Sequence, residues 1–373
     1  MVDARPARFH VGVLLGALLL VCMTASTGAA QSANTIPSSR NGGLVGIPVI
    51  DDHIAGFKRI STLDGLWQSR VMSIVQDDQG FMWFGTQHGL NRYDGYKFKL
   101  FRHEPGRQDS LSGVYVHYIF KDRNGHLWVA NDAFLDRFDP VTETFTHYVF
   151  DSKKPDDPAN RVAHISQDRN GMLWLATING LRRLDPASGE ITEYRHEPRD
   201  STSLSDSSVY FSGEDRRGTL WVTTAEGLDR FDRTTGRVTQ HVPMPNRRFY
   251  EDSHGVLWLI DSIGSGLTVF DRDTGQLTRY SFREREPDHT SRSGARALIE
   301  DKAGNLWLGT IHDGLLKFER DQNRFVRYRK QAGKPVSLAD NDVIALFEDR
   351  ESNIWIGLEE TGVNYLSTRK PFF

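Results

Sequence analysis

Polar side chains that could bind a ligand or move a proton fall in seven short segments that recur along the chain. Each segment follows an apolar stretch that contains Trp, and the segments differ from one another in length and composition. Histidine is the usual general base, whereas carboxylates and amides suit hydrogen bonding to a polar ligand. The candidate ligand-binding residues are His88, Asn131, Asp132, Asn179, Glu226, Asp261, Ser262, His312, Asp313, Glu359 and Glu360.

The types and spacing of these residues favour binding over catalysis. His88 and His312 lie in the first and sixth segments, and no acidic set accompanies them that would complete a metal site or a catalytic base. The turn at 168–171 lacks the alternating acidic ligands and the closing Glu of a calcium loop. A ring of mixed donors and acceptors suits a neutral polyhydroxylated ligand, although a solvated turn is the simpler interpretation of any single residue. We therefore predict no enzyme activity, no metal and no cofactor.

A repeat positions the seven segments. Its core, Asp-x-x-Gly-x-x-Trp, appears first at Asp77, Gly80 and Trp83, and a last copy ends at Trp355 with Ser352 in place of Gly. Seven of the 8 tryptophans belong to this repeat, and its period is roughly 45 residues. A period of that length is typical of propeller blades or of a solenoid.

Each copy of the repeat predicts four short strands, because apolar and polar residues alternate between turn signals. In the third copy the strands are expected at 162–166, 172–177, 181–184 and 191–194. Four meandering strands make one propeller blade, and seven blades close a ring without long open edges. The sequence therefore predicts an all-β fold, a seven-bladed β-propeller of four-stranded antiparallel blades.

The repeated residues have a structural interpretation. Asp forms hydrogen bonds to the backbone of the turn, Gly takes the positive φ that a hairpin requires, and Trp fills the space between adjacent blades. In a four-stranded meander these tight turns lie on one face of the ring. The loops between the second and third strands lie on the other face, together with the long links between blades. All the candidate residues are therefore expected on one face, where loops on a rigid scaffold commonly carry function.

The ends of the propeller are expected to complete each other. Residues 56–61 resemble the fourth strand of a blade, as found at 324–329, but they precede the first repeat. The seventh copy reaches its third strand near Leu366, and the sequence given stops at Phe373 where a fourth strand is due. We predict that the early strand completes the last blade and closes the ring.

The first 30 residues have the pattern of a secretory signal peptide. Arg5 and Arg8 precede an apolar stretch at 11–23, and small residues at 28–30 form a cleavage site. An uncleaved membrane anchor and a lipid anchor on Cys22 are the alternatives. We therefore expect a periplasmic protein.

Three segments are predicted in order: a signal peptide at 1–30, a flexible linker at 31–55 and the propeller at 56–373. The linker is assigned because Ser, Asn, Gly and Pro occur there with little periodicity. The net charge of −3 and the scattered basic residues argue against nucleic acid as a partner.

The run from Ile60 to Leu66, followed by 71–86 and 89–95, closely resembles the opening of the two-component regulator propeller family. The resemblance covers about residues 57–373 in seven copies. Members of this family are periplasmic sensor domains of bacterial hybrid two-component systems and related receptors, and their ligands are often oligosaccharides. The resemblance implies a sensor domain that binds a glycan or another polar small molecule.

The resemblance also implies a partner for signalling. In that family two propellers commonly precede an immunoglobulin-like domain, a membrane helix and a cytoplasmic kinase or diguanylate cyclase module. This sequence contains one propeller, so we expect the output module in a longer, membrane-tethered receptor or in a partner protein. The sequence leaves dimerisation open.

Two other functions compete with the sensor. Streptogramin-lyase-like propellers are seven-bladed enzymes with a similar Gly-x-x-Trp strand, and they need a base, usually His, and a metal at the channel mouth. His88 and His312 are expected on the corresponding face. The other alternative is a protein-interaction scaffold, for which a propeller needs no special residues.

Overall fold

The computed structural model describes residues 45–52, 55–150, 157–244, 248–260, 266–281 and 294–367. The predicted signal peptide and the predicted linker up to residue 44 lie outside the described residues. No helix in the described part of the chain has the length and hydropathy that a membrane span requires.

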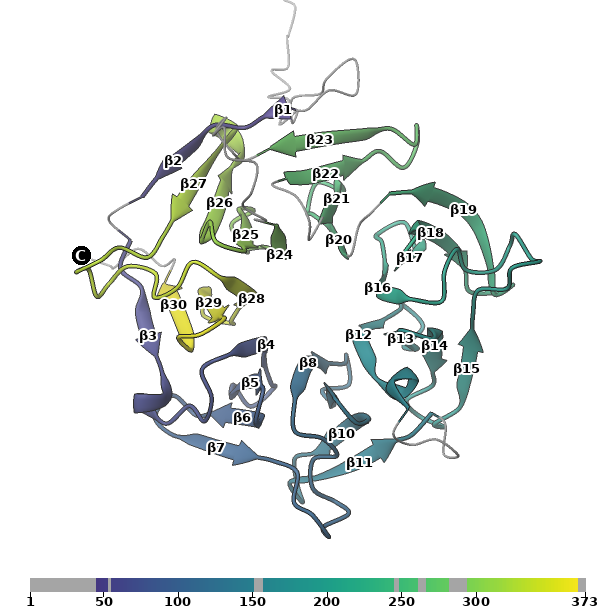
Figure 1. The fold of residues 1–373 in the computed structure, drawn as a ribbon, viewed down its shortest axis with the longest axis horizontal. Coiled ribbons are helices and arrows are strands. Elements are labelled where there is room, and N and C mark those ends of the chain that lie inside the picture. The colour runs from purple at the N-terminus through teal and green to yellow at the C-terminus, as the bar shows by residue number, and fades with distance from the viewer. Residues whose placement is uncertain are drawn as a thin grey trace, which may run out of the picture. The chain divides into compact units, whose positions relative to one another are not determined.

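Seven antiparallel sheets arranged as blades of a ring make up the described fold (Figure 1), as the repeat predicts. Blades 1 to 3 contain β4 (Val71–Gln76), β5 (Met82–Thr86), β6 (Gly89–Tyr93) and β7 (Phe98–Phe101); β8 (Val116–Lys121), β9 (Leu127–Asn131), β10 (Leu135–Asp139) and β11 (Thr144–Tyr148); and β12 (Val162–Gln167), β13 (Leu173–Thr177), β14 (Gly180–Leu184) and β15 (Ile191–Tyr194). Blades 4 and 5 contain β16 (Val209–Glu214), β17 (Leu220–Thr224), β18 (Gly227–Asp232) and β19 (Arg237–Pro243); and β20 (Arg248–Glu251), β21 (Leu257–Ile260), β22 (Gly266–Phe270) and β23 (Leu277–Ser281). Blades 6 and 7 contain β24 (Ala295–Glu300), β25 (Leu306–Thr310), β26 (Leu315–Glu319) and β27 (Arg324–Tyr328); and β28 (Val343–Glu348), β29 (Asn353–Leu358), β30 (Val363–Ser367) and β3 (Lys58–Ile60). Three short 3-10 helices lie between strands, at η1 (Thr62–Asp64), η2 (Pro158–Asn160) and η3 (Arg320–Gln322).

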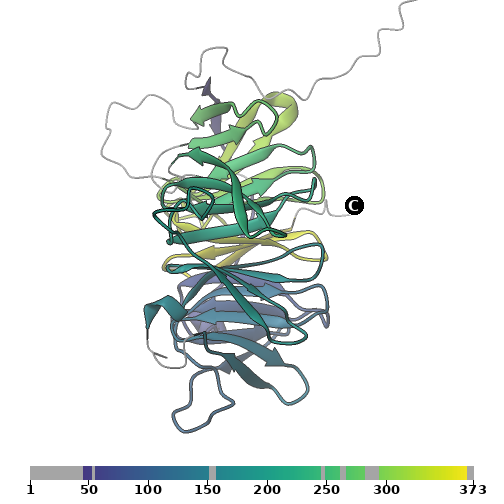
Figure 2. The same cartoon turned by 90° about the vertical axis from the view of Figure 1, so that its right-hand side faces the viewer.

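The strands run between two faces of the propeller (Figure 2). The face with the Asp-x-x-Gly turns is called the turn face here. The loop face carries the loops between the second and third strands and the links between blades. Backbone hydrogen bonds join loops and links on that face. For example, Gly89 N donates to Val114 O at 2.8 Å, and Gly314 N donates to Asn341 O at 2.9 Å.

The early strand closes the ring as the sequence predicts. β3 pairs antiparallel with β30, and Ile60 lies opposite Val363. Phe57, just before β3, is buried at 5% exposure in the cluster between blades 6 and 7. The last blade therefore combines three strands from the end of the repeat with one from its beginning.

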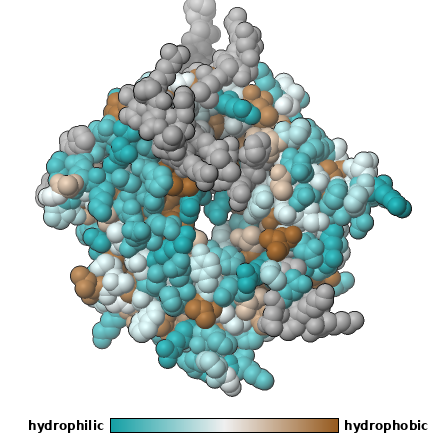
Figure 3. Space-filling view, viewed as in Figure 1, coloured by the Kyte–Doolittle hydropathy of each residue, from teal (hydrophilic) through white to brown (hydrophobic). Residues whose placement is uncertain are grey.

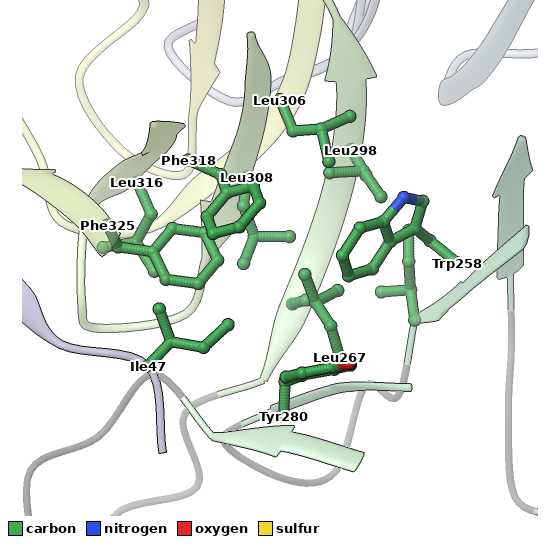
Figure 4. Packing of buried hydrophobic residues seen from close by; sticks show 12 residues of the cluster. Ile47, Trp258, Leu267, Tyr280, Leu298, Leu306, Leu308, Leu316, Phe318 and Phe325 are labelled. Atoms are coloured by element: carbon green, nitrogen blue, oxygen red, sulfur yellow. The ribbon is translucent and has the colours of Figure 1, made fainter. Parts of the chain in front are cut away.

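The linker prediction is wrong for residues 45–51, which form two short strands. β1 (Val45–Gly46) pairs parallel with β23 of blade 5, and β2 (Val49–Asp51) pairs parallel with β27 of blade 6. The physical reason is that the outermost strands of these blades offer unpaired backbone groups to an added strand. Ile47 between the two strands is 3% exposed and packs against the side chains of both blades, among them Phe325 and Tyr280 (Figure 4).

The repeated tryptophans lie between adjacent blades, as predicted, and all seven are at most 6% exposed. Trp258 of blade 5, for example, packs with Leu298 and Phe318 of blade 6 (Figure 4). The structure adds a contact that the sequence did not suggest. In every blade the Trp Nε1 donates to the side chain of the turn Asp, over 2.7–2.9 Å.

The turn Asp serves the backbone and the Trp together. In blade 3, Asp168 Oδ1 accepts from Asn170 N at 2.9 Å and Met172 N at 3.1 Å, while Oδ2 accepts from Trp174 Nε1 at 2.9 Å. Gly171 takes a φ of 87°, and in blade 7 Ser352 takes a φ of 64° at the equivalent position. The Asp-x-x-Gly-x-x-Trp repeat is therefore one structural unit that fixes both the turn and the packing between blades.

A second repeated contact joins neighbouring blades on the turn face. The residue before the turn Asp accepts a hydrogen bond from the backbone of the preceding blade, as when Arg169 N donates to Glu214 Oε2 at 2.7 Å. The equivalent pairs are Arg123 N with Gln167, Arg216 N with Glu251, Ser253 N with Glu300, Lys302 N with Glu348 and Arg350 N with Gln76. Between blades 1 and 2 the charges are exchanged, and Lys121 Nζ donates to Asp78 Oδ1 at 2.6 Å.

Candidate functional site

The described candidate residues all lie in or beside the loops between second and third strands, and so on the loop face, where the sequence places them. Asp261 and Ser262 lie outside the described residues. The side chains of His88, Glu226, His312 and Glu360 are exposed, whereas those of Asp132, Asn179, Asp313 and Glu359 are half-buried. Asn131 is fully buried.

Asn131 shapes its loop from within. Its Oδ1 accepts from Ala133 N at 2.9 Å and Phe134 N at 3.0 Å, and its Nδ2 donates to Asp136 Oδ2 at 2.8 Å. In blade 1 the equivalent Thr86 holds the loop in a similar way, accepting from the backbone two residues on at 3.3 Å. The amide of Asn131 is therefore fully engaged inside the loop and offers no surface to a ligand in this structure.

Asp132 joins its loop to the neighbouring links. Its Oδ1 accepts from Val114 N at 2.9 Å and Tyr115 N at 3.0 Å, and its carbonyl accepts from Arg161 Nε at 2.9 Å. Asn179 and Glu226 each donate a backbone N–H to the Thr that begins their loop. These hydrogen bonds fix the backbone of the loops in blades 3 and 4, which carry the side chains of Asn179 and Glu226.

Charged side chains from blades 6, 7 and 1 meet at the loop face. Glu359 forms ion pairs with Arg70 at 2.7 Å and with Arg296 at 3.5 Å. His312 pairs with Asp342 at 2.9 Å, and Asp342 O accepts from Glu359 N at 3.1 Å. We call these five residues, Arg70, Arg296, His312, Asp342 and Glu359, the rim cluster.

The rim cluster brings together only two of the predicted residues, His312 and Glu359. Its other members were missed because they come from links and an inner strand, and only ring closure places blades 6, 7 and 1 side by side. The carboxylate of Asp313 instead lies 3.6 Å from Arg329 and 3.9 Å from Arg327. Within the described residues, no hydrogen bond or ion pair joins His88, Asp132, Asn179 or Glu226 to a candidate of another blade.

An aromatic side chain that the sequence analysis did not select lies on the same face. Trp67 is the one tryptophan outside the repeat, and its side chain is 58% exposed. It follows Leu66, which is buried at 1% exposure between blades, and its backbone N–H donates to Asn91 Oδ1 at 3.2 Å. The link backbone thus holds an exposed indole in place on the loop face.

A cavity on the ring axis lies away from the loop face. A cavity of about 570 Å³ occupies the central channel and is lined by the inner strands of the blades. Its lining reaches Asp349 and Arg350, so it opens toward the turn face. None of the candidate loop residues lines it. This cavity was not predicted from the sequence, because the inner strands were interpreted as structural.

A known family profile matches the repeated segments of this sequence. The sequence profile described as the two component regulator propeller matches residues 65–88, 110–133, 291–312 and 337–360. Each of the first two segments runs from a link through two strands into the loop that follows, so each match is half a blade and its link. These four segments of the propeller therefore carry the two-component regulator propeller repeat.

Solved structures of extracellular domains share the fold of this regulator propeller. The extracellular domain of a hybrid two-component system from B. thetaiotaomicron is 26% identical, with a TM-score of 0.73, over 85% of this chain and 42% of that chain. The extracellular domain of a one-component system from the same organism is 21% identical, with a TM-score of 0.69, over 83% of this chain and 40% of that one. This chain therefore spans less than half the length of these structures.

Two further relatives are similar over a part of the sequence or in fold alone. A histidine kinase from Formosa agariphila is 46% identical over 56 residues, which are 15% of this chain and 4% of the kinase. The virginiamycin B lyase from Staphylococcus aureus is 16% identical, with a TM-score of 0.63, over 84% of this chain and 99% of the lyase. At that identity the lyase shares the seven-bladed fold with the regulator propeller and nothing more follows from it.

Proposed function

We propose that this regulator propeller is the ligand-binding sensor domain of a bacterial signal-transduction receptor, and that its ligand is a glycan or another polar molecule bound on the loop face. One observation carries the proposal. The turn face repeats the same Asp and Trp contacts in all seven blades, whereas the loop face presents a different set of polar side chains in each described loop. Loops that vary on a rigid scaffold are where binding specificity is usually built.

The chemistry of the loop face supports a polyhydroxylated ligand. Exposed His88, Glu226 and His312 offer both donors and acceptors. The exposed indole of Trp67 offers a flat apolar surface on the same face, which suits the apolar face of a sugar ring. A glycan combines hydroxyl groups with such faces, so it matches this surface better than a purely apolar ligand does.

The receptor architecture of the relatives supports the signalling part of the proposal. The structure at 26% identity is an extracellular domain of a hybrid two-component system, and the partial relative is a histidine kinase. We propose that the regulator propeller likewise works outside the cytoplasm, after export by the segment 1–30. Its output is a kinase or cyclase module, in a longer chain or in a partner protein.

A thermal-shift screen of oligosaccharides against the purified protein tests the proposal. A ligand that binds only the folded form raises the unfolding free energy by about 2.7 kcal/mol at a hundredfold excess over Kd. The shift should decrease in loop-face variants, namely Trp67→Ala, His88→Ala, Glu226→Ala, His312→Ala and Glu359→Ala. Tyr96→Ala is the matched control, because Tyr96 is 90% exposed in a turn between third and fourth strands on the opposite face.

Two results would contradict the proposal. A shift that survives all five loop-face changes would place the ligand elsewhere. Turnover of the ligand that is abolished by a chelator and by His88→Ala or His312→Ala would favour a lyase-like enzyme instead.

A further inference from the structure

One residue in each inner strand, four positions before the turn Asp, lines the central cavity. These seven equivalent residues are called the channel ring, and they are Ser73, Tyr118, His164, Phe211, Arg248, Ala297 and Ala345. Because the blades are related by the rotation of the ring, the seven side chains meet at one level of the channel. Figure 3 shows that the propeller is open at its centre, with hydrophobic atoms beside the opening.

The channel ring is strongly asymmetric. Blades 2 to 5 contribute large side chains, and blades 1, 6 and 7 contribute Ser73, Ala297 and Ala345, respectively. The ring centroids of Tyr118 and His164 are 4.7 Å apart, and those of His164 and Phe211 are 3.7 Å apart at an interplanar angle of 24°.

The stack continues into Phe249, whose ring centroid is 5.0 Å from that of Phe211. One wall of the channel is therefore a continuous aromatic surface. The opposite wall consists of small side chains, and the space they leave is part of the cavity of about 570 Å³, which is large enough for a small organic molecule.

Arg248 is the one charged member of the channel ring. Its Nη1 donates to Arg296 O at 3.2 Å, and no carboxylate of the described residues forms an ion pair with it. Burial lowers the pKa of Arg248 from its usual value, although a guanidinium still carries its charge at neutral pH. Burial, with a smaller effect of Arg248, holds the pKa of His164 well below its usual value, so His164 is neutral beside it.

The charged groups at the turn-face mouth are occupied by the propeller itself. Lys121 and Arg350 pair with Asp78, and Glu348 accepts from Lys302 N at 2.9 Å. Asp349 accepts from Trp355 Nε1 at 2.7 Å. Lys302 Nζ donates to the backbone carbonyls of Asp349 at 2.7 Å and of Arg350 at 3.0 Å. Arg248 is therefore the cation that lies beside the aromatic wall and away from the turn-face mouth.

We propose that the channel of this propeller is a second ligand site, which binds an aromatic carboxylate. The carboxylate pairs with the guanidinium of Arg248, which can donate two parallel hydrogen bonds to it. The aryl group lies along Tyr118, His164 and Phe211 and occupies the space left by Ala297 and Ala345. The ligand enters from the turn face, so the site is separate from the loop face and does not rest on the function proposed above.

The test uses phenylacetate and its neutral isostere phenylacetamide, with binding measured by calorimetry and by thermal shift on the whole protein. Phenylacetate should bind and raise Tm, whereas phenylacetamide should bind about tenfold more weakly or worse, because it lacks the charge. Arg248→Met removes the guanidinium and keeps the length of the stem, and it should weaken phenylacetate by about tenfold or more. Arg217→Met is the control, since Arg217 is an exposed turn-face arginine paired with Asp273.

A second variant tests the opposite wall. Ala297→Phe introduces the residue that blade 4 already carries at the equivalent position, Phe211, so the fold accepts this side chain there. It should fill the cavity and abolish phenylacetate binding while the protein stays folded by circular dichroism. It also keeps the proposal testable if Arg248→Met does not fold.

Three results would overturn the proposal. One is equal affinity for phenylacetate and phenylacetamide. Another is unchanged phenylacetate binding in either Arg248→Met or Ala297→Phe. The third is the lack of any binding at millimolar phenylacetate. Since oligosaccharide binding is measured with different variants, failure here leaves the loop-face proposal standing, and the reverse also holds.

Discussion

The carboxylate of the turn Asp has two oxygens, and the fold uses both. In blade 3 one oxygen of Asp168 accepts from the turn backbone and the other accepts from Trp174, which is buried between blades. Arg233 also approaches Asp168 Oδ2, at 3.3 Å. An amide cannot replace this group, because one of its two ends donates hydrogen bonds.

Asp168→Asn therefore should destabilise the propeller, since either orientation of the amide places an NH₂ group against a donor. The loss should be about 1–3 kcal/mol of unfolding free energy, the cost of a buried polar group left without its partner. Urea denaturation measures it. Asp185→Asn is the control, because Asp185 lies in an exposed turn and keeps an acceptor for Ala187 N. A loss as small as that of the control would show that the indole contact contributes nothing.

The contact between His147 and Asp136 makes the unfolding free energy depend on pH. The hydrogen bond that His147 Nδ1 donates to Asp136 Oδ1, over 2.6 Å, raises the pKa of His147 above its usual value. The stabilisation is therefore fully present below about pH 6.5, the histidine pKa of an unfolded chain, and is lost as the pH rises through the folded pKa.

The difference in unfolding free energy between the wild type and His147→Gln should accordingly be larger at pH 6 than at pH 8. Denaturant titrations at both pH values measure it. The comparison needs the variant, because His164, with its lowered pKa, affects the wild type in the opposite direction. A difference that does not change between the two pH values would contradict the role of the charged imidazole.

At the level of the blade, the turn-face contact between blades 1 and 2 has the opposite arrangement of charges from the equivalent contacts between the other blades. The residue after the turn Asp is basic or Ser in blades 2 to 7, but it is Asp78 in blade 1. The partner in blade 2 is Lys121, where the other blades have Gln or Glu. The exchange of charge preserves an attractive pair, and the Lys121 ammonium lowers the pKa of Asp78.

Lys121→Glu alone should lower Tm, because it places two carboxylates at one interface. Adding Asp78→Arg should recover part of the lost Tm, because the double variant reproduces the arginine and glutamate pair of Arg169 and Glu214 but removes the ion pair of Asp78 with Arg350. Thermal melts of the wild type, both single variants and the double variant form a complete cycle. No recovery in the double variant would mean that the charges of residues 78 and 121 do not determine the stability of this interface.

The sequence predicted blades well and contacts between distant segments poorly. Turn signals and alternation indicate each four-stranded blade, and the unpaired strand before the first repeat indicates the ring closure. β1 and β2 were missed because two- and three-residue strands carry no measurable periodicity, and their partners lie more than 200 residues away. The rim cluster and the channel ring were missed for a related reason, since both form only when equivalent positions of different blades meet.

The whole molecule depends on its N-terminal strands in two steps. Ile47 packs between blades 5 and 6, and truncating a buried Ile typically costs about 2–5 kcal/mol. Phe57 and β3 complete blade 7. Chains that begin at residue 45, 55 and 61 should therefore show two successive decreases in Tm, the second larger than the first. Equal melting of the first two chains would show that β1 and β2 add no stability, and equal melting of the last two would show that β3 does not close the ring.

The pairing of β3 with β30 also determines when the ring can close during synthesis of the chain. The two strands lie about 300 residues apart, so β3 leaves the ribosome long before its partner is synthesised. Until β30 arrives, blade 7 and β3 both present open edges, which are sites for aggregation and proteolysis. A chain interrupted anywhere before blade 7 keeps its first strand unpaired. The closure therefore acts as a check on completeness, because only a chain synthesised through its last blade can hide both edges at once.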